Sequence, residues 1–167
     1  ETDFLVTSAK LLNTMEKLER KIPPVALFIV LGVVMNHVGH EFHTFSVSLP
    51  IPWIVLLACF AISVFVGVAG VYEFRKANTT VNPVKVKDAS QVVDSGVFAY
   101  SRNPMYLGMF LLLLGFAYWH QNLLCIALAF VFVLYMNRFQ ISPEERALEE
   151  LFGAAYLDYK QRVRRWI

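Results

Sequence analysis

The chain has 167 residues, of which 57% are hydrophobic and only 17% are charged, and its formal net charge is +2. A soluble globular domain has about 45–50% apolar and about 25% charged residues. This composition therefore excludes a disordered chain and is typical of an integral membrane protein. The small net charge gives no reason to expect a nucleic-acid partner. Cys59 and Cys125 each stand in an apolar run, which favours buried thiols over a disulfide or a metal pair.

Three stretches of the chain contain no Asp, Glu, Lys or Arg and could hold membrane-spanning helices of about 20 residues: 22–40, 42–72 and 103–137. The third stretch is too long for one span. Polar and aromatic residues at 119–122 interrupt it, which indicates a turn between two short helices. We therefore predict an all-α membrane protein that forms a single domain over residues 1–167. Its four transmembrane helices are predicted at 24–39, 51–72, 104–118 and 123–137.

The basic residues predict the orientation of these spans. All 15 Lys and Arg lie before the first span, between the second and third, or after the fourth. Cytoplasmic segments are enriched in Lys and Arg, so both termini and the loop 73–103 are predicted to be cytoplasmic in a multi-pass membrane protein. In residues 4–22 the apolar side chains recur near helical spacing, which predicts an amphipathic N-terminal helix on the membrane surface.

The segment 143–166 predicts a cytoplasmic C-terminal helix. Ser142 can cap its start, and Glu145, three residues later, completes a capping box. Asn103 before Pro104 predicts a second capped start, at the third span, so two helix N-termini lie at one membrane depth and can hold a charged small molecule. The apolar residues of the tail recur at spacings of three and four and predict one continuous stripe: Leu148, Leu151, Phe152, Ala155, Tyr156, Tyr159, Val163 and Trp166.

Two motifs resemble those of isoprenylcysteine carboxyl methyltransferases and of the related phospholipid N-methyltransferases. The run Arg102-Asn103-Pro104-Met105-Tyr106, followed by Leu107 and Gly108, resembles the Arg-His-Pro-x-Tyr-x-Gly region of that family. The tail at 144–163 resembles its Glu-Glu-x-x-Leu and Phe-Gly-x-x-Tyr-x-x-Tyr signature, and residues 80–83 match a further element upstream. Together these motifs cover about the last ninety residues, in the family's order, and they flank the predicted helical hairpin.

The resemblance implies methyl transfer from S-adenosylmethionine to a membrane lipid or another lipophilic substrate that enters from the bilayer. It implies Arg138 and Glu144 as catalytic residues, with Arg138 facing the acceptor. Asn103 stands where the best-known members have His, so any role that needs an imidazole is lost there. The cofactor-binding residues that it implies are Ser90, Gln91, Val92, Val93, Phe98, Asn103, Pro104, Met105, Tyr106, Gly108, Glu144 and Glu145.

These residue types suit the chemistry. Methyl transfer from a sulfonium is an in-line displacement that needs positioning in a dry pocket and no metal. A carboxylate for the cofactor's ammonium, backbone donors for its carboxylate and an aromatic wall would suffice. Glu144, the helix start at 103–106 and the aromatic residues Phe98, Tyr100 and Tyr106 supply each type.

Other roles remain open from the residues alone. Glu145 could serve only the capping box, Gly108 only close helix packing, and Arg138 only as a snorkelling anchor. The acceptor could be a prenylated cysteine carboxylate, a phospholipid amine or a hydrophobic thiol, and the oligomeric state is left open.

A different class of function is a small transporter or a non-catalytic membrane protein. The lack of Asp, Glu, Lys and Arg within the spans disfavours a transporter. His37, His40, Glu41 and His43 are closely spaced but match no standard zinc pattern, so no metal site is predicted.

Overall fold

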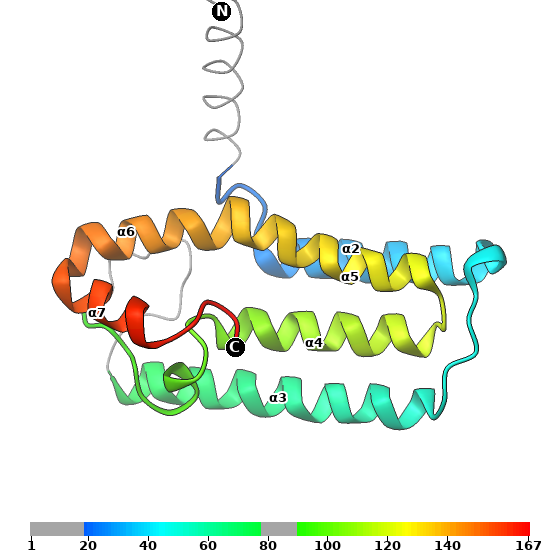
Figure 1. Ribbon diagram of the computed structural model, residues 1–167, viewed down its shortest axis with the longest axis horizontal. Helices are drawn as coiled ribbons and strands as arrows, with labels where there is room; N and C mark the ends of the chain where they lie inside the picture. Colours follow the sequence, from blue (N-terminus) through cyan, green and yellow to red (C-terminus); the bar gives the residue numbers. More distant parts are fainter. Residues whose placement is uncertain (1–18, 78–89) are drawn as a thin grey trace, which may run out of the picture.

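The structure is a computed structural model that describes residues 19–77 and 90–167 (Figure 1). Its helices are α2 (Pro24–Glu41), α3 (Pro52–Lys76), α4 (Pro104–Trp119), α5 (Leu123–Tyr135), α6 (Ser142–Phe152) and α7 (Ala154–Arg162). A π-helical segment, η4 (Met136–Ile141), joins α5 to α6, and the short turns η1 (His43–Phe45) and η3 (Gly96–Ala99) lie in loops. The described residues contain no strand, only one isolated bridge between Ser46 and Asn122, so the predicted all-α class is confirmed.

Two predicted features fall largely outside these ranges. Of the amphipathic helix predicted at 4–22, only residues 19–22 are described, and they form no helix. The family element at 80–83 lies entirely outside the described residues.

Three helices are long and apolar enough to cross a membrane: α2, α3 and the continuous helix Leu123–Phe152, whose apolar part is α5. The fourth apolar helix, α4, has 16 residues, which gives it a length of about 24 Å. It lies between α3 and α5 and also contacts α2 (Figure 1). The membrane-helical architecture is thus present with three candidate spanning helices, and the predicted count of four stays a prediction.

Small residues bring α4 close to α3. A Cβ added at Gly115 would lie 2.6 Å from the Cβ of Cys59, and one at Gly108 would lie 3.3 Å from the backbone oxygen of Ser63. In lipid, helices gain little from the hydrophobic effect between them, so close van der Waals packing through small residues holds them together. The opposite face of α3 is exposed and apolar, with Phe65 68% exposed, as expected of a lipid-facing surface.

The predicted helix start at Ser142 is wrong, because the chain runs from α5 through η4 into α6 without interruption. Ser142 has helical dihedral angles, and its hydroxyl donates to the backbone oxygen of Asn137 instead of capping a helix. Pro143 cannot donate to the oxygen of Phe139, four residues earlier. That oxygen instead accepts the backbone N–H of Arg20 at 2.9 Å, so the segment before α2 satisfies the carbonyl that the proline leaves free.

The predicted single helix over 143–166 is also wrong. Gly153 ends α6 with φ at +54°, a backbone conformation that L side chains rarely adopt. The chain reverses there, and α7 folds back toward the start of α4 (Figure 1). The predicted apolar stripe is therefore divided. Tyr156, Tyr159 and Val163 form the buried part of a small second core, against which Leu148 and Phe152 of α6 pack.

The Lys and Arg residues that the structure describes gather at one end of the bundle. This end holds the residues before α2, the end of α3, the start of α4, and all of η4, α6 and α7 (Figure 1). The sequence motifs lie in the same layer, which we call the polar layer: η3, the start of α4, η4, α6, α7 and the segment 163–167.

Candidate functional site

A buried carboxylate lies where the start of α4 meets α6. Glu144 is 9% exposed, and its Oε1 accepts hydrogen bonds from the hydroxyl of Tyr106 at 2.8 Å and from the amide of Gln140. Among the described residues, no hydrogen-bond donor reaches its Oε2. Burial raises the pKa of Glu144 to about 7, although both hydrogen bonds and the charge of Arg20 act in the opposite direction. One oxygen of this carboxylate is therefore held in place, and the described residues supply no donor to the other.

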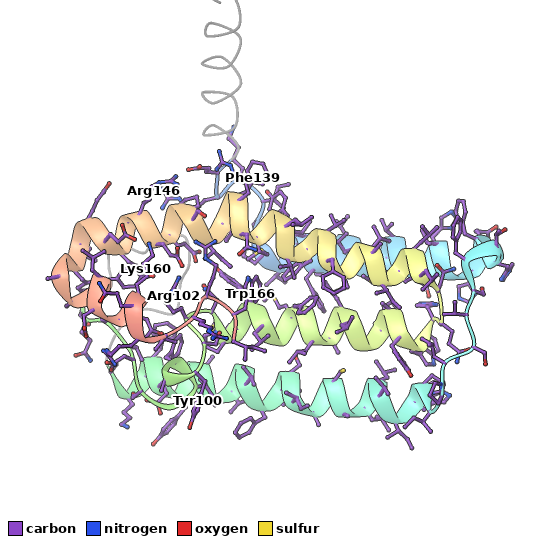
Figure 2. The ribbon with its side chains drawn as sticks, in the orientation of Figure 1. Tyr100, Arg102, Phe139, Arg146, Lys160 and Trp166 are labelled. Carbon is purple, nitrogen blue, oxygen red and sulfur yellow. The ribbon has the colours of Figure 1, made fainter. Side chains whose placement is uncertain are left out.

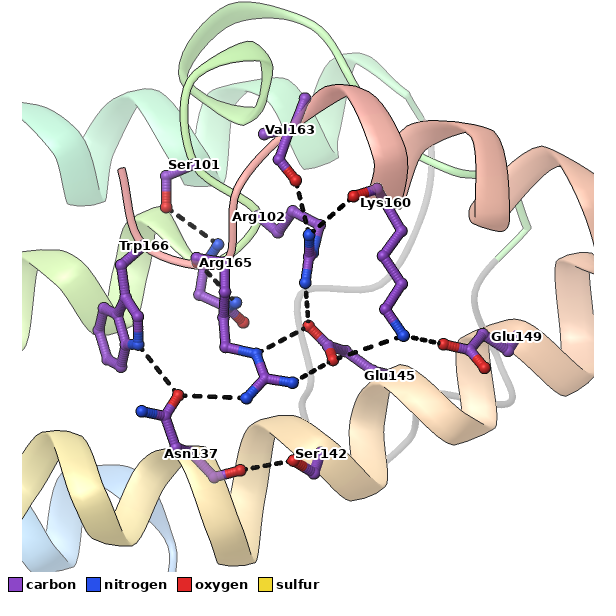
Figure 3. A network of polar contacts seen from close by, with 11 residues as sticks. Ser101, Arg102, Asn137, Ser142, Glu145, Glu149, Lys160, Val163, Arg165 and Trp166 are labelled. Carbon is purple, nitrogen blue, oxygen red and sulfur yellow. Dashed lines mark hydrogen bonds and ion pairs between the residues drawn. The ribbon is translucent and has the colours of Figure 1, made fainter.

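Glu145 is the centre of a buried ion-pair network (Figure 3). Its Oε1 accepts from Nη2 of Arg102 at 2.6 Å, and Arg165 binds both of its oxygens. Arg102 also donates to the backbone oxygens of Val163, at 2.6 Å, and Lys160, at 3.1 Å. Burial raises the pKa of Glu145, but the hydrogen bonds from the two arginines outweigh it and leave that pKa below its usual range. Both oxygens of this carboxylate accept hydrogen bonds from protein side chains. Glu145 therefore links α6 to the start of α4 and to the C-terminal segment.

The C-terminal segment 163–167 lies along the start of α4 (Figure 3). Asn103 precedes the first residue of α4 as predicted, but its side chain makes no cap and donates instead to the backbone oxygen of Arg165 at 3.0 Å. The indole of Trp166 donates to the Oδ1 of Asn137 in η4 at 3.0 Å. The segment thereby joins α4 to the continuous helix across the site.

The predicted loop residues 90–93 and Phe98 bring α3 and α7 together. Phe98 is 5% exposed, its ring contacts that of Phe74 with centroids 4.8 Å apart, and its carbonyl accepts the hydroxyl of Tyr159 at 2.8 Å. Val93 is buried and Val92 packs against the second core, whereas Ser90 and Gln91 are exposed. These contacts place the loop over the end of α3.

The residues in the first turns of α4 face two different neighbouring helices. Tyr106 points to Glu144 on α6, as its hydrogen bond shows. Met105 and Gly108 face α3 instead: the Met105 side chain lies against Gly70, and Gly108 lies against Ser63. Of the predicted cofactor residues of α4, the structure therefore joins Tyr106 directly to Glu144 and leaves Met105 and Gly108 in the helix interface.

Arg138 is not joined to Glu144 by any contact. Its guanidinium pairs with Glu19 at 2.7 Å and lies 5.4 Å from the centre of the Phe139 ring. Glu19 also pairs with Arg146, and Figure 2 shows Phe139 and Arg146 on the outer side of the continuous helix, away from Arg102. Among the described residues, the partners of Arg138 thus belong to the segment before α2 and to its own helix.

A cavity of about 530 Å³ opens on the outer side of α3, beside η3. Its lining includes Phe65 and Tyr72 of α3 together with Tyr100, which is 80% exposed and points away from the bundle (Figure 2). Glu73, 9% exposed, lines its polar end and accepts the hydroxyl of Ser95. The cavity combines the apolar outer face of α3 with one carboxylate, that of Glu73.

The histidines lie at the opposite end of the bundle. The rings of His40 and His120 meet edge to face with their centroids 5.7 Å apart. Among residues 19–77 and 90–167, no group of three or more His, Cys, Asp and Glu side chains is arranged to hold a metal ion.

Four polar residues of the site were not predicted from the sequence as site residues: Arg102, Asn137, Gln140 and Arg165. Arg102 directly precedes Asn103 in the first family motif, so the motif itself could have identified it. No sequence pattern identifies Gln140 or Asn137. Their contacts with Glu144 and Trp166 depend on η4 and on the return of the C-terminal segment, which the sequence does not reveal.

Comparisons with known proteins bear on the same part of the chain. A family model described as phospholipid methyltransferase matches residues 53–155. An uncharacterized protein of Haemophilus influenzae is 46% identical over 63 residues, which cover 38% of this chain and all of that protein. The protein-S-isoprenylcysteine O-methyltransferases of Saccharomyces cerevisiae and Mus musculus are 39% and 37% identical over 83 and 76 residues.

Those matches cover 48% and 46% of this chain but only 34% and 27% of the yeast and mouse proteins. The chain thus spans about a third or less of the length of these named relatives. No solved structure matches it.

Proposed function

The chain belongs to the phospholipid methyltransferase family, and from that premise we propose that it transfers a methyl group from S-adenosylmethionine to a lipophilic acceptor at the cytoplasmic face of a membrane. One observation carries the proposal. The two family motifs meet in a buried polar site, where Tyr106 of the first holds Glu144 of the second and one carboxylate oxygen has no donor from the described residues.

This site fits the cofactor. The open oxygen of Glu144 would accept the ammonium group of the cofactor, and a charge-assisted hydrogen bond of this kind is among the stronger ones in proteins. In the first turn of α4 the backbone N–H groups of Met105 and Tyr106 have no acceptor among the described residues and would suit the cofactor's carboxylate. Loop residues 90–93 and Phe98 would cover the cofactor from the side of α3. When bound, the sulfonium supplies an electrophilic methyl group, and the chain's residues would orient the acceptor atom toward it and exclude water.

The gathering of basic residues at one end supports an orientation with this site in the cytoplasm. We further propose that α4 is the third of four spans, since it is apolar and packs between α3 and α5. Cysteine substitutions at exposed positions within 90–95 and 147–158 should then react with an impermeant reagent added from the cytoplasmic side, and substitutions at exposed positions within 43–48 only from the other side. Labelling of 147–158 from outside would refute the orientation.

The acceptor is proposed to be an amphiphile that enters from the bilayer. The names of the yeast and mouse relatives favour a prenylated cysteine carboxylate. The family description favours a phospholipid amine as the second candidate, and a hydrophobic thiol is the third. Methylation of a prenylcysteine, phosphatidylethanolamine and an alkyl thiol, measured side by side, distinguishes them. Efficient methylation of a fully water-soluble acceptor would refute entry from lipid.

Calorimetric titration of the detergent-solubilised protein with S-adenosylmethionine tests the cofactor site. Glu144→Gln should weaken binding by about 1.5–3 kcal/mol, the range for a lost hydrogen bond to a charged group. Glu150→Gln is the matched control, because Glu150 lies on the same helix with an exposed side chain. Wild-type protein that binds no S-adenosylmethionine, or a Glu144→Gln variant that binds as wild type does, would refute the proposal.

A further inference from the structure

A buried amide lies one helical turn before Glu144. Gln140 is 2% exposed, and its neighbours Met136 and Ile141 are fully buried. Its Nε2 donates to the Oε1 of Glu144, the same oxygen that accepts from Tyr106. An amide in apolar surroundings costs free energy unless it is hydrogen-bonded. The hydrogen bond that Gln140 donates goes to the oxygen of Glu144 that Tyr106 also binds, while the other oxygen accepts no donor from the described residues.

The contact joins residues four apart in the continuous helix, a spacing that places side chains on one helix face. Gln140 belongs to η4, whose wider turn accommodates Pro143 within the continuous helix. π-Helical turns are rare and occur frequently at functional sites, and this one lies next to the hydrogen-bonded pair Tyr106 and Glu144. Tyr106 reaches the same oxygen from α4, so the carboxylate is held from two helices.

We propose that Gln140 is a positioning residue of the cofactor site: its amide fixes the Glu144 carboxylate so that the open oxygen faces the ligand. This inference rests on the proposed function. The charged and titratable groups that act on Glu144 are Tyr106 from α4, Arg20 from the segment before α2, and Glu145 from its own helix. Loss of the Gln140 hydrogen bond removes a donor that favours the ionised carboxylate.

The pH dependence of S-adenosylmethionine binding tests this role, because a carboxylate that must be ionised to bind an ammonium group loses affinity as the pH falls below its pKa. Calorimetric titrations of the wild-type protein between pH 5.5 and 8.5 should show affinity that rises with pH through about 7. In Gln140→Leu the midpoint should move up by about one pH unit, which makes binding at pH 6 up to about tenfold weaker and restores it near pH 8.5.

Two further variants sharpen the test. Tyr106→Phe removes the other donor to the same oxygen and should move the midpoint in the same direction, so it replaces Gln140→Leu if that variant does not fold. Ser142→Ala is the control: it removes a hydrogen bond from the same helix that does not touch Glu144, and its midpoint should equal that of wild type. The amino group of the cofactor titrates identically in every sample, so differences between variants report on the protein.

The outcomes separate the two proposals. Wild-type protein that binds no S-adenosylmethionine refutes the proposed function and this inference with it. Wild-type protein that binds, together with Gln140→Leu and Tyr106→Phe midpoints equal to that of wild type, refutes the positioning role alone. A Gln140→Leu affinity that falls equally at every pH indicates damage to the fold and also refutes it.

Discussion

Replacing Glu145 with Ala should destabilise the protein by breaking a buried ion pair. The side chains of Glu145 and Arg102 are only 6% and 8% exposed, so the substitution leaves a buried guanidinium without its counter-ion. Breaking a buried ion pair by removing one partner costs about 3–5 kcal/mol. Two backbone oxygens still accept from Arg102 in the variant, which favours the lower end, about 3 kcal/mol.

Glu149→Ala is the matched control for this substitution. Glu149 lies one turn further along α6, and its side chain is 31% exposed and pairs with a Lys160 side chain that is 36% exposed. An ion pair this exposed to solvent is worth about 0–1 kcal/mol. The free energies of unfolding can be compared by titrating the protein from mild detergent into SDS and following tryptophan fluorescence. Equal losses of unfolding free energy for the two variants would refute the role of Glu145 as a structural link between segments.

The pH dependence of the same measurement gives an internal check. The pKa of Glu145 lies below its ordinary value of 4.5 in the folded protein. Its contribution to stability is therefore present above about pH 4.5 and is lost as the pH falls through the lower, folded pKa. Wild type and Glu145→Ala should differ most near neutral pH and converge in acid.

Three further predictions concern backbone and helix packing and the acceptor. Gly115→Ala should destabilise by about 1–3 kcal/mol, because its Cβ would meet Cys59 at 2.6 Å, whereas Gly67→Ala, with open space around it, should cost little in the same SDS titration. Gly153→Ala should lose about 1–3 kcal/mol through its positive φ alone, since nothing lies within 4 Å of the added Cβ, and an unchanged unfolding midpoint would contradict this. Arg138→Ala should leave S-adenosylmethionine affinity intact, because its guanidinium pairs with Glu19 and has no contact with Glu144; loss of methylation of a carboxylate acceptor would assign Arg138 to that acceptor, and unchanged turnover would exclude it from the reaction.

The helices that depend on local signals were predictable from the sequence. Helices were predicted at 24–39 and at 104–118, and they are observed as Pro24–Glu41 and Pro104–Trp119. In both, a run of apolar residues provides the helix and a proline marks its first residue. Neither signal depends on another part of the chain.

The break predicted at Ser142 fails for a reason that no local pattern contains. Pro143 is equally suited to the first turn of a helix and to a helix whose lost hydrogen bond is replaced from elsewhere. The replacement comes from the backbone N–H of Arg20, more than a hundred residues earlier in the chain. The reversal at Gly153 differs, since a glycine in the middle of a predicted stripe was a visible local signal for a break.

The acidic pair of the second motif divides into two roles because of helix geometry. Neighbouring residues on an α-helix point about 100° apart, so Glu144 and Glu145 cannot face the same partner. Glu144 faces α4 and keeps one oxygen open, whereas Glu145 faces the returning C-terminal segment and is saturated by Arg102 and Arg165. A double substitution of the pair would therefore confuse loss of the fold with loss of the ligand. The single variants separate them, because Glu145→Ala acts first on unfolding and Glu144→Gln first on cofactor affinity.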